Sequence, residues 1–140
     1  MEKSEITPEL MEKIQARIPE GKPIVMFNLL RYRDYAEYPD VVIEKISGRD
    51  AYYKNYASAF NQIVTEIGAP TIKVIYVGKV QANIISNGEI WDDVVLVKYP
   101  DFATLQSIIN HPNYANKAAL HHNAAIKEWS WFATTRIMDI

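Results

Sequence analysis

Apolar side chains recur about once per helical turn along residues 8–18, and polar residues fill the positions between them. Thr7 can cap free amides, and Pro8 suits the first helical position. The apolar stripe that follows consists of Leu10, Ile14 and Ile18. This spacing predicts a short amphipathic helix near the start of the chain.

A longer helical pattern begins after Ser47, which is a good helix cap, and ends at Gly68. Pro70 bars any continuation of this helix. Between the two ends, large apolar residues follow a period of 3.6. They are Tyr53, Tyr56, Phe60, Ile63 and Ile67.

Four stretches are rich in β-forming residues and predict strands over 24–32, 71–86, 91–99 and 129–137. Asn87 and Gly88 form a turn signal, so the second and third strands should make a hairpin. Gly78, inside the second strand, suggests a bulge or a close backbone approach.

Two further helices are expected between the third and fourth strands. Asp101 can cap the first of them, and Pro112 can open the second, which runs to about Lys127. The segment 33–46 is read as a long connection or flap, with a brief extended piece in the apolar run from Val41 to Ile43.

After the first helix the predicted order is strand, helix, strand, strand, helix, strand. This βαββαβ order is typical of an α+β, ferredoxin-like fold with a four-stranded antiparallel sheet. We expect one domain over 1–140, with the extra N-terminal helix at about 8–18 and the core at about 24–137.

Two helices would cover one face of this sheet and leave the other face bare. We expect the bare face to carry Met26, Leu30 and Tyr32 from the first strand and Val94 and Leu96 from the third. A monomer rarely exposes an apolar patch of several hundred Å². The pattern therefore predicts a homodimer in which a second copy covers this face.

The composition limits which binding partners and which compartment we expect. The net charge is −2 and no basic cluster stands out, so nucleic acid is not expected. There is no cysteine, and we expect neither a leader peptide nor a membrane span, so a cytoplasmic protein is the expectation.

Five motifs occur in order: Phe27-Asn28-Leu29-Leu30-Arg31-Tyr32, Gly48-Arg49-Asp50-Ala51-Tyr52, Trp91-Asp92-Asp93-Val94-Val95-Leu96-Val97-Lys98-Tyr99-Pro100, His111-Pro112-Asn113-Tyr114 and His121-His122. Together they resemble the domain-of-unknown-function family 1330 of the dimeric α/β-barrel superfamily, over about Ile24 to Thr135. The family often has Arg where this chain has His122.

The resemblance implies two sheets packed face to face in a dimer, with a small cavity between each sheet and its helices or at the barrel centre. The family has no agreed activity. Its superfamily includes cofactor-free oxygenases, small-ring isomerases, haem-binding enzymes and ligand-binding regulators. The fold therefore does not choose among these functions.

Histidines are the first candidates for chemistry. His122 lies in an apolar helical stripe, where it is either a proton shuttle near neutral pH or a core residue bonded to a carbonyl. His121 points about 100° away around the helix, so the two do not suit one metal ion. His111, before Pro112, either lines a cavity mouth or fills the helix break.

Polar residues near the strand ends are the next candidates. Asp92 is a possible base if it points into the barrel, and otherwise a solvated strand end or a partner of Arg49 or Arg31. Arg49 opposes the dipole of its helix, so either an anionic ligand or a carboxylate such as Asp92 or Asp50 should hold it. Trp91 is grouped with these residues as a binding candidate.

Asn28 should be buried on a central strand, where it either orients a substrate carbonyl or bonds across the dimer. Tyr32 and Tyr52 are candidates for a pocket wall, because they combine an aromatic body with a polar tip. We expect the Trp129 and Trp131 pair to reflect packing.

Besides a purely structural or interaction module, these residues support three functional hypotheses. One is a cofactor-free oxygenase or isomerase for a small aromatic or carbonyl compound, with His122 and Asp92 as catalytic residues. Another is a non-catalytic protein that binds a small apolar ligand or acts in stress. The third is haem binding through His111 or His122. No phosphate loop or nucleophile motif is present, so we expect no cofactor and no triad hydrolysis.

Overall fold

The computed structural model describes residues 6–39, 45–69 and 71–139. Their strands form one four-stranded antiparallel sheet in the order β2-β3-β1-β4. The strands are β1 (Ile24–Tyr32), β2 (Lys73–Lys79), β3 (Asp93–Tyr99) and β4 (Ile126–Thr134).

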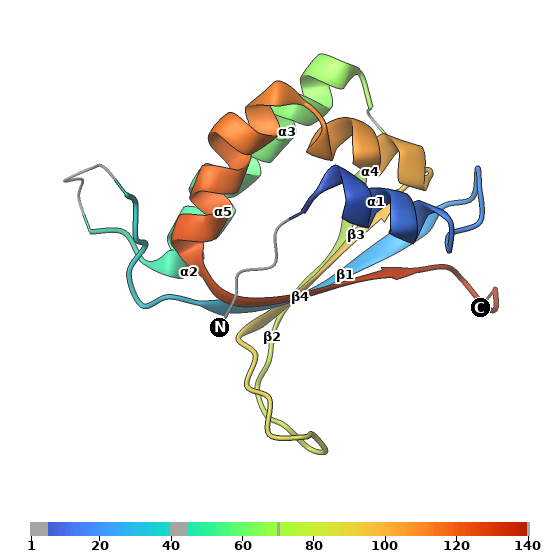
Figure 1. Cartoon of the computed structure of the whole chain (residues 1–140). Helices are drawn as coiled ribbons and strands as arrows, with labels where there is room; N and C mark the ends of the chain where they lie inside the picture. The colour runs from blue at the N-terminus through green and yellow to red at the C-terminus, as the bar shows by residue number, and fades with distance from the viewer. Residues whose placement is uncertain (1–5, 40–44, 70, 140) are drawn as a thin grey trace.

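The helices lie on one side of this sheet, as Figure 1 shows. After α1 the chain runs strand, helix, strand, strand, helix, strand, so the predicted ferredoxin-like α+β fold is confirmed. The helical segments are α1 (Pro8–Gln15), α2 (Gly48–Asp50), the π-helical η1 (Ala51–Tyr56), α3 (Ala57–Ile67), α4 (Phe102–Ile109), the π-helical η2 (Tyr114–Ala118) and α5 (Ala119–Ala125).

The long helix predicted after Ser47 is present as the unbroken run of α2, η1 and α3. The Ser47 hydroxyl accepts a hydrogen bond from the backbone N–H of Asp50 at 3.0 Å, which caps the helix as expected. Gly68 ends it with φ of 69°, a left-handed conformation that glycine adopts without strain.

The predicted strand ends need correction. β2 stops at Lys79 rather than near residue 86, and β3 begins at Asp93 rather than at Trp91. Residues 80–92 instead form an arm that projects beyond the sheet (Figure 1). β4 starts directly after α5 at Ile126 and ends at Thr134, three residues earlier at each end than predicted.

The bulge that Gly78 suggested for β2 lies at another residue of the strand. The register of β2 against β3 shifts between Val74 and Tyr76, so the bulged residue is Ile75. Gly78 marks a close approach by a side chain, since a Cβ there would meet the Tyr76 ring at 2.4 Å.

The two faces of β1 are the reverse of the prediction. Met26, Leu30 and Tyr32 are buried beneath the helices, and Phe27 lies on the uncovered face. Both faces of β1 are apolar, so alternation alone could not assign them. The pairing register shows which face of β1 is uncovered, because Phe27 is paired with Leu96. Leu96 lies on the uncovered face, as predicted.

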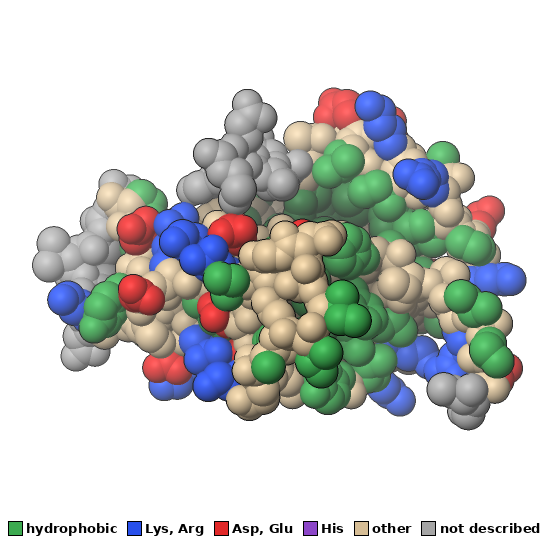
Figure 2. All heavy atoms as spheres, turned by 90° about the horizontal axis from the view of Figure 1, so that it is seen from below, with side chains coloured by type: hydrophobic (Ala, Val, Ile, Leu, Met, Phe, Trp, Pro, Cys, Tyr) green, Lys and Arg blue, Asp and Glu red, His purple; other side chains and the backbone are tan. Residues whose placement is uncertain are grey.

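We call this uncovered side of the sheet the back face. A row of large apolar side chains crosses all four strands there, and Figure 2 shows hydrophobic side chains gathered on it. The paired residues in this row are Tyr76, Leu96, Phe27 and Phe132.

Between Tyr32 and Ser47, the described residues include a short extended contact. Tyr35 and Ser47 form an isolated antiparallel bridge, and the Ala36 N–H donates to the Ile46 carbonyl at 2.9 Å. The apolar run from Val41 to Ile43 lies outside the described residues. Among the described helices, none is long and apolar enough to cross a membrane.

Candidate functional site

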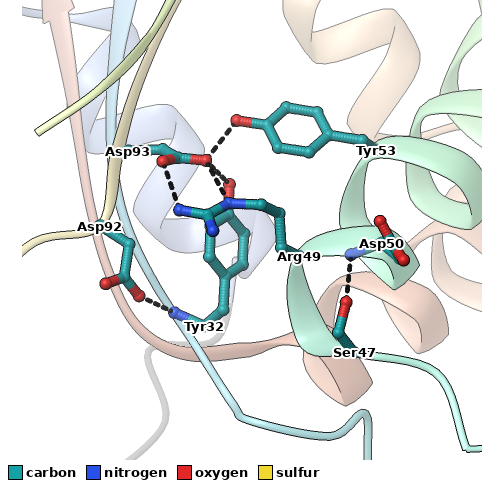
Figure 3. A network of polar contacts seen from close by, with 7 residues as sticks. All are labelled: Tyr32, Ser47, Arg49, Asp50, Tyr53, Asp92 and Asp93. Atoms are coloured by element: carbon teal, nitrogen blue, oxygen red, sulfur yellow. Dashed lines mark hydrogen bonds and ion pairs between the residues drawn. The ribbon is translucent and has the colours of Figure 1, made fainter.

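A buried carboxylate, that of Asp93, organises one end of the sheet (Figure 3). Arg49 donates to it twice, from Nη2 to Oδ1 at 2.9 Å and from Nε to Oδ2 at 3.2 Å. The hydroxyls of Tyr32 and Tyr53 also donate to Oδ2, at 2.7 and 2.6 Å. Three of these four bonds end on Oδ2, which fills its acceptor sites, and Oδ1 accepts the fourth.

The protonation states follow from this arrangement. Burial raises the pKa of Asp93, but the hydrogen bonds from Arg49, Tyr53 and Tyr32 lower it by more, so the net shift is downward. Burial, followed by the bond to Asp93, raises the pKa of Tyr53 to about 12. The carboxylate is therefore charged and the phenols are neutral donors at pH 7. A carboxylate that is held by an Arg and two Tyr side chains and has a lowered pKa is a poor general base.

A cavity of about 180 Å³ lies next to this network, between the helical layer and the sheet. Aromatic rings supply much of its wall, and β2 closes one side of it with Val74 and Val77. Cavities of this kind suit small apolar ligands. The aromatic residues of the wall include Tyr52, Tyr53, Tyr56, Tyr114, Trp129 and Trp131.

Asn28 supplies the one primary amide on the sheet side of the cavity wall. Its Nδ2 donates to the Val95 carbonyl at 3.1 Å, and its Oδ1 accepts from Trp129 Nε1 at 3.0 Å. Trp129 stacks on Trp131 with ring centroids 4.8 Å apart. The amide is therefore held in one orientation and fixes the indole pair as part of the wall. Both of these bonds lie within the subunit.

The structure separates Asp92 from this cavity. Its Oδ2 accepts the backbone N–H of Tyr32 at 2.9 Å, and Figure 3 shows it turned away from the guanidinium. Arg49 and Arg31 pair with Asp93 and Glu128 instead. The predicted partners of Arg49, Asp92 and Asp50, are therefore wrong, although a carboxylate does hold it.

His122 is a core residue, 5% exposed, with its ring 4.3 Å from Trp129 and 4.9 Å from Tyr56 between ring centroids. Burial lowers the pKa of His122 to about 3, so the imidazole is neutral near pH 7. This does not fit the predicted proton shuttle near neutral pH. It is not among the residues that line the cavity.

The other predicted site residues fall into two groups. Tyr32 and Tyr52 pack together at 5.9 Å, and Tyr52 also stacks on Tyr56 at 5.2 Å, so both belong to the aromatic wall or its support. His111 lies apart, where Nε2 meets Glu66 Oε2 at 3.0 Å and Nδ1 accepts the Asn113 N–H. It fills the helix break.

Trp91 is not among the residues that line the cavity either. Its Nε1 donates to Glu89 Oε2 at 3.3 Å on the exposed arm. In the part of the chain that the structure describes, no group of three or more His, Asp or Glu side chains could hold a metal ion.

Sequence reasoning missed Asp93 and most of the aromatic wall. The wall residues that it did not assign to the site are Tyr53, Tyr56, Tyr114, Trp129 and Trp131. Strand alternation held the signal for Asp93, because Asp93 shares the parity of Val95 and Tyr99, which were expected to face the helices. A carboxylate on that face needs a cation, and Arg49 begins the helix that packs there.

The chain matches no protein-family model, and no curated protein matches it. It is similar to a solved protein of unknown function from Rhodopseudomonas palustris, with 28% identity over 96% of this chain and 97% of that chain and a TM-score of 0.77. A methylated form of that protein gives a TM-score of 0.78 at the same identity, over 96% and 94% of the chains. A dimeric ferredoxin-like protein of unknown function from Bacteroides fragilis is 15% identical over 83% and 98%, with a TM-score of 0.49.

Proposed function

We propose that this protein binds a small, flat aromatic or carbonyl compound in the cavity between its helices and its sheet. The cavity of about 180 Å³ carries the proposal, because its wall combines many aromatic faces with few polar groups. Rings stack favourably on Tyr and Trp side chains, and the oriented Asn28 amide adds one fixed polar contact nearby.

The residues of the cavity wall fit a protein that binds its ligand without catalysis better than they fit an enzyme. An oxygenase or isomerase needs a group that moves a proton near neutral pH. No His, Asp or Glu is among the described residues that line the cavity. Its tyrosines have raised pKa values, chiefly from burial, as for Tyr52 and Tyr56. Neither His111 nor His122 lines it, which disfavours haem ligation.

We also propose that the chain belongs to the domain-of-unknown-function family 1330 and works as a homodimer. The ordered motifs from Phe27 to His122 support the family. The apolar back face supports the dimer, since Phe132 is 50% and Tyr76 56% exposed in the single chain. A second copy of the same row would bury both.

The projecting arm also supports a second copy of the chain as the partner. Ile84 and Ile85 are 94% and 95% exposed, and the arm extends on the back-face side of the sheet (Figure 1). Two apolar side chains so fully exposed are costly in water, at roughly 2 kcal/mol for each one left unburied. An arm that packs against the second copy would remove this cost.

Calorimetric titration with phenylacetamide and acetophenone, at millimolar concentration, tests ligand binding. We expect binding by the wild type and at least a tenfold loss in Ala57→Phe, because Ala57 lines the cavity and a larger side chain would fill it. Ser58→Phe is the matched control, because the next residue is exposed and not part of the lining. Equal affinity in both variants, or no heat with either compound, would refute the proposal.

A further inference from the structure

A second, more open hollow adjoins the aromatic cavity at the β2 edge of the sheet. Tyr53 and Val77 line both hollows, so the two hollows are neighbours and together form a depression with two parts. Arg49 and Lys79 lie on the edge side of this depression. It therefore has an apolar end and an end that carries two cationic side chains.

The guanidinium of Arg49 has capacity left for a ligand. Asp93 occupies Nε and Nη2, and Arg carries five N–H donors in all. Nη1 forms no hydrogen bond or ion pair with another described residue. The side chain of Arg49 is 43% exposed, and its guanidinium lies 5.2 Å from the centroid of the Tyr32 ring. The group is thus held on one edge and open on the other.

Lys79 adds a second positive charge at the same place. It is the cross-strand partner of Asp93, and such partners share one face of the sheet. Lys79 is exposed and forms no ion pair with any other residue in the described ranges. Asp93 balances one of the two cations. Asp92 also carries a negative charge, but its effect on the two cations is weaker than that of Asp93. It lies on the other side of β3 and is turned toward the Tyr32 amide.

Resting on the proposed function, we infer that the natural ligand is a small aromatic carboxylate, with its ring in the aromatic cavity and its carboxylate at Arg49 Nη1 and Lys79. Two cations with an open donor edge favour a compact anion over a neutral amide, because charge-assisted hydrogen bonds are about twice as strong as neutral ones. Tyr53 lies between the two parts, because it lines both hollows and its hydroxyl donates to Asp93.

A matched pair of probes tests this inference. Phenylacetate and phenylacetamide have nearly the same shape and differ in charge. Calorimetric titration of the full chain should give at least tenfold tighter binding of phenylacetate. In Lys79→Gln the preference should fall below threefold, because the variant loses more affinity for phenylacetate than for phenylacetamide. Arg49→Gln should lose the preference too, but that change also removes the partner of a buried carboxylate, so Lys79→Gln is the decisive variant.

Lys73→Gln is the control, because Lys73 lies on the same strand and pairs with Lys98 at its far end. It should keep the full preference. Equal binding of both probes by the wild type, or an undiminished preference in Lys79→Gln, would overturn the carboxylate site and leave ligand binding intact. If neither probe binds, the proposed function fails with it.

Discussion

The guanidinium of Arg49 and the carboxylate of Asp93 meet along two parallel hydrogen bonds, at 2.9 and 3.2 Å, although 44 positions separate them in the chain. Arg49 lies in the first helical turn after Ser47, and Asp93 is the first residue of β3. The pair ties the helical layer to the sheet beside the cavity. Tyr53 joins the same carboxylate from the cavity wall.

Replacing Asp93 by Asn should destabilise the protein. The variant loses the charge and turns an amide N–H toward groups that are themselves donors, so at least one hydrogen bond from Arg49, Tyr32 or Tyr53 is lost. Hydrogen bonds to charged groups contribute about 1.5–3 kcal/mol, and Arg49 is partly exposed. We expect the free energy of unfolding in urea to fall by about 2 kcal/mol.

Asp92→Asn is the matched control one residue away. Its described hydrogen bond comes from the Tyr32 backbone, and an Asn oxygen can still accept it. The loss should stay below about 1 kcal/mol. Equal losses in the two variants would show that Asp93 has no special role in holding the layers together.

His122 should make stability depend on pH. Burial lowers its pKa to about 3, whereas an unfolded His titrates near 6.5. Between these values the unfolded chain binds a proton that the folded chain does not. The free energy of unfolding should therefore fall as the pH drops below about 6.5, by about 1.4 kcal/mol per unit from this group. Above pH 6.5 the imidazole is neutral in both states, so His122 no longer changes the free energy of unfolding with pH.

Urea unfolding at several pH values between 4.5 and 6.5 measures this slope. His122→Gln should remove most of it, whatever the variant's stability at pH 7. Burial also lowers the pKa of His121, which is less buried, so His121→Gln should remove a smaller part. Asp93 affects stability in a different pH range. Its pKa is lowered, so its contribution to the free energy of unfolding is lost only below about pH 4. An unchanged slope in His122→Gln would contradict the neutral, buried state.

Gly48 should be intolerant of any side chain. A Cβ there would lie 2.2 Å from the Arg33 carbonyl oxygen and 2.6 Å from that of Ala125, and neither backbone can yield easily. The same segments are joined by the bonds from Gly48 N to Arg33 O and from Arg33 N to Ala125 O. Gly48→Ala should cost about 3 kcal/mol of unfolding free energy, mostly through overpacking.

Gly78→Ala provides the comparison. The three atoms nearest to a Cβ there all belong to the side chain of Tyr76, which is exposed in the single chain and can rotate away. Its cost should be about 1 kcal/mol or less. If thermal unfolding ranks the two variants in the opposite order, the packing at the start of α2 is not as described.

The back face should carry the dimer contact. Phe27→Asp and Phe132→Asp each place a charge within the apolar row, so each should raise the dimer dissociation constant at least tenfold in sedimentation experiments. Leu120→Asp is the control, because Leu120 is 40% exposed on the helical side. A wild type that sediments as a monomer at micromolar concentration would contradict the dimer.

Local sequence signals sufficed for most of the fold. Caps such as Ser47 and Gly68, and the strand 24–32, were predicted because they depend on neighbouring residues alone. The arm and the start of β4 were not predicted. Whether residues 80–92 pair as strands or project is decided by tertiary contacts, and so is the point where α5 passes directly into β4 at Ile126.

The candidate site was only partly predictable. Asn28, Tyr52 and Arg49 were identified because a polar or aromatic residue in an apolar pattern is visible in the sequence. Asp93 was not chosen over Asp92, because the two differ only in the face to which they point. Strand alternation held the signal for that face, and the register confirms it, because Asp93 is paired with the buried Leu30.

Nuclear Overhauser effects between bound phenylacetate and the side chains of the protein test the central claim most directly. If the aromatic cavity is the ligand site, the ring protons of the probe should show contacts to the indoles of Trp129 and Trp131 and to the ring of Tyr56. Contacts confined to Ile84 and Ile85 of the arm, or to Phe27 and Phe132 of the back face, would place the ligand elsewhere and contradict the account.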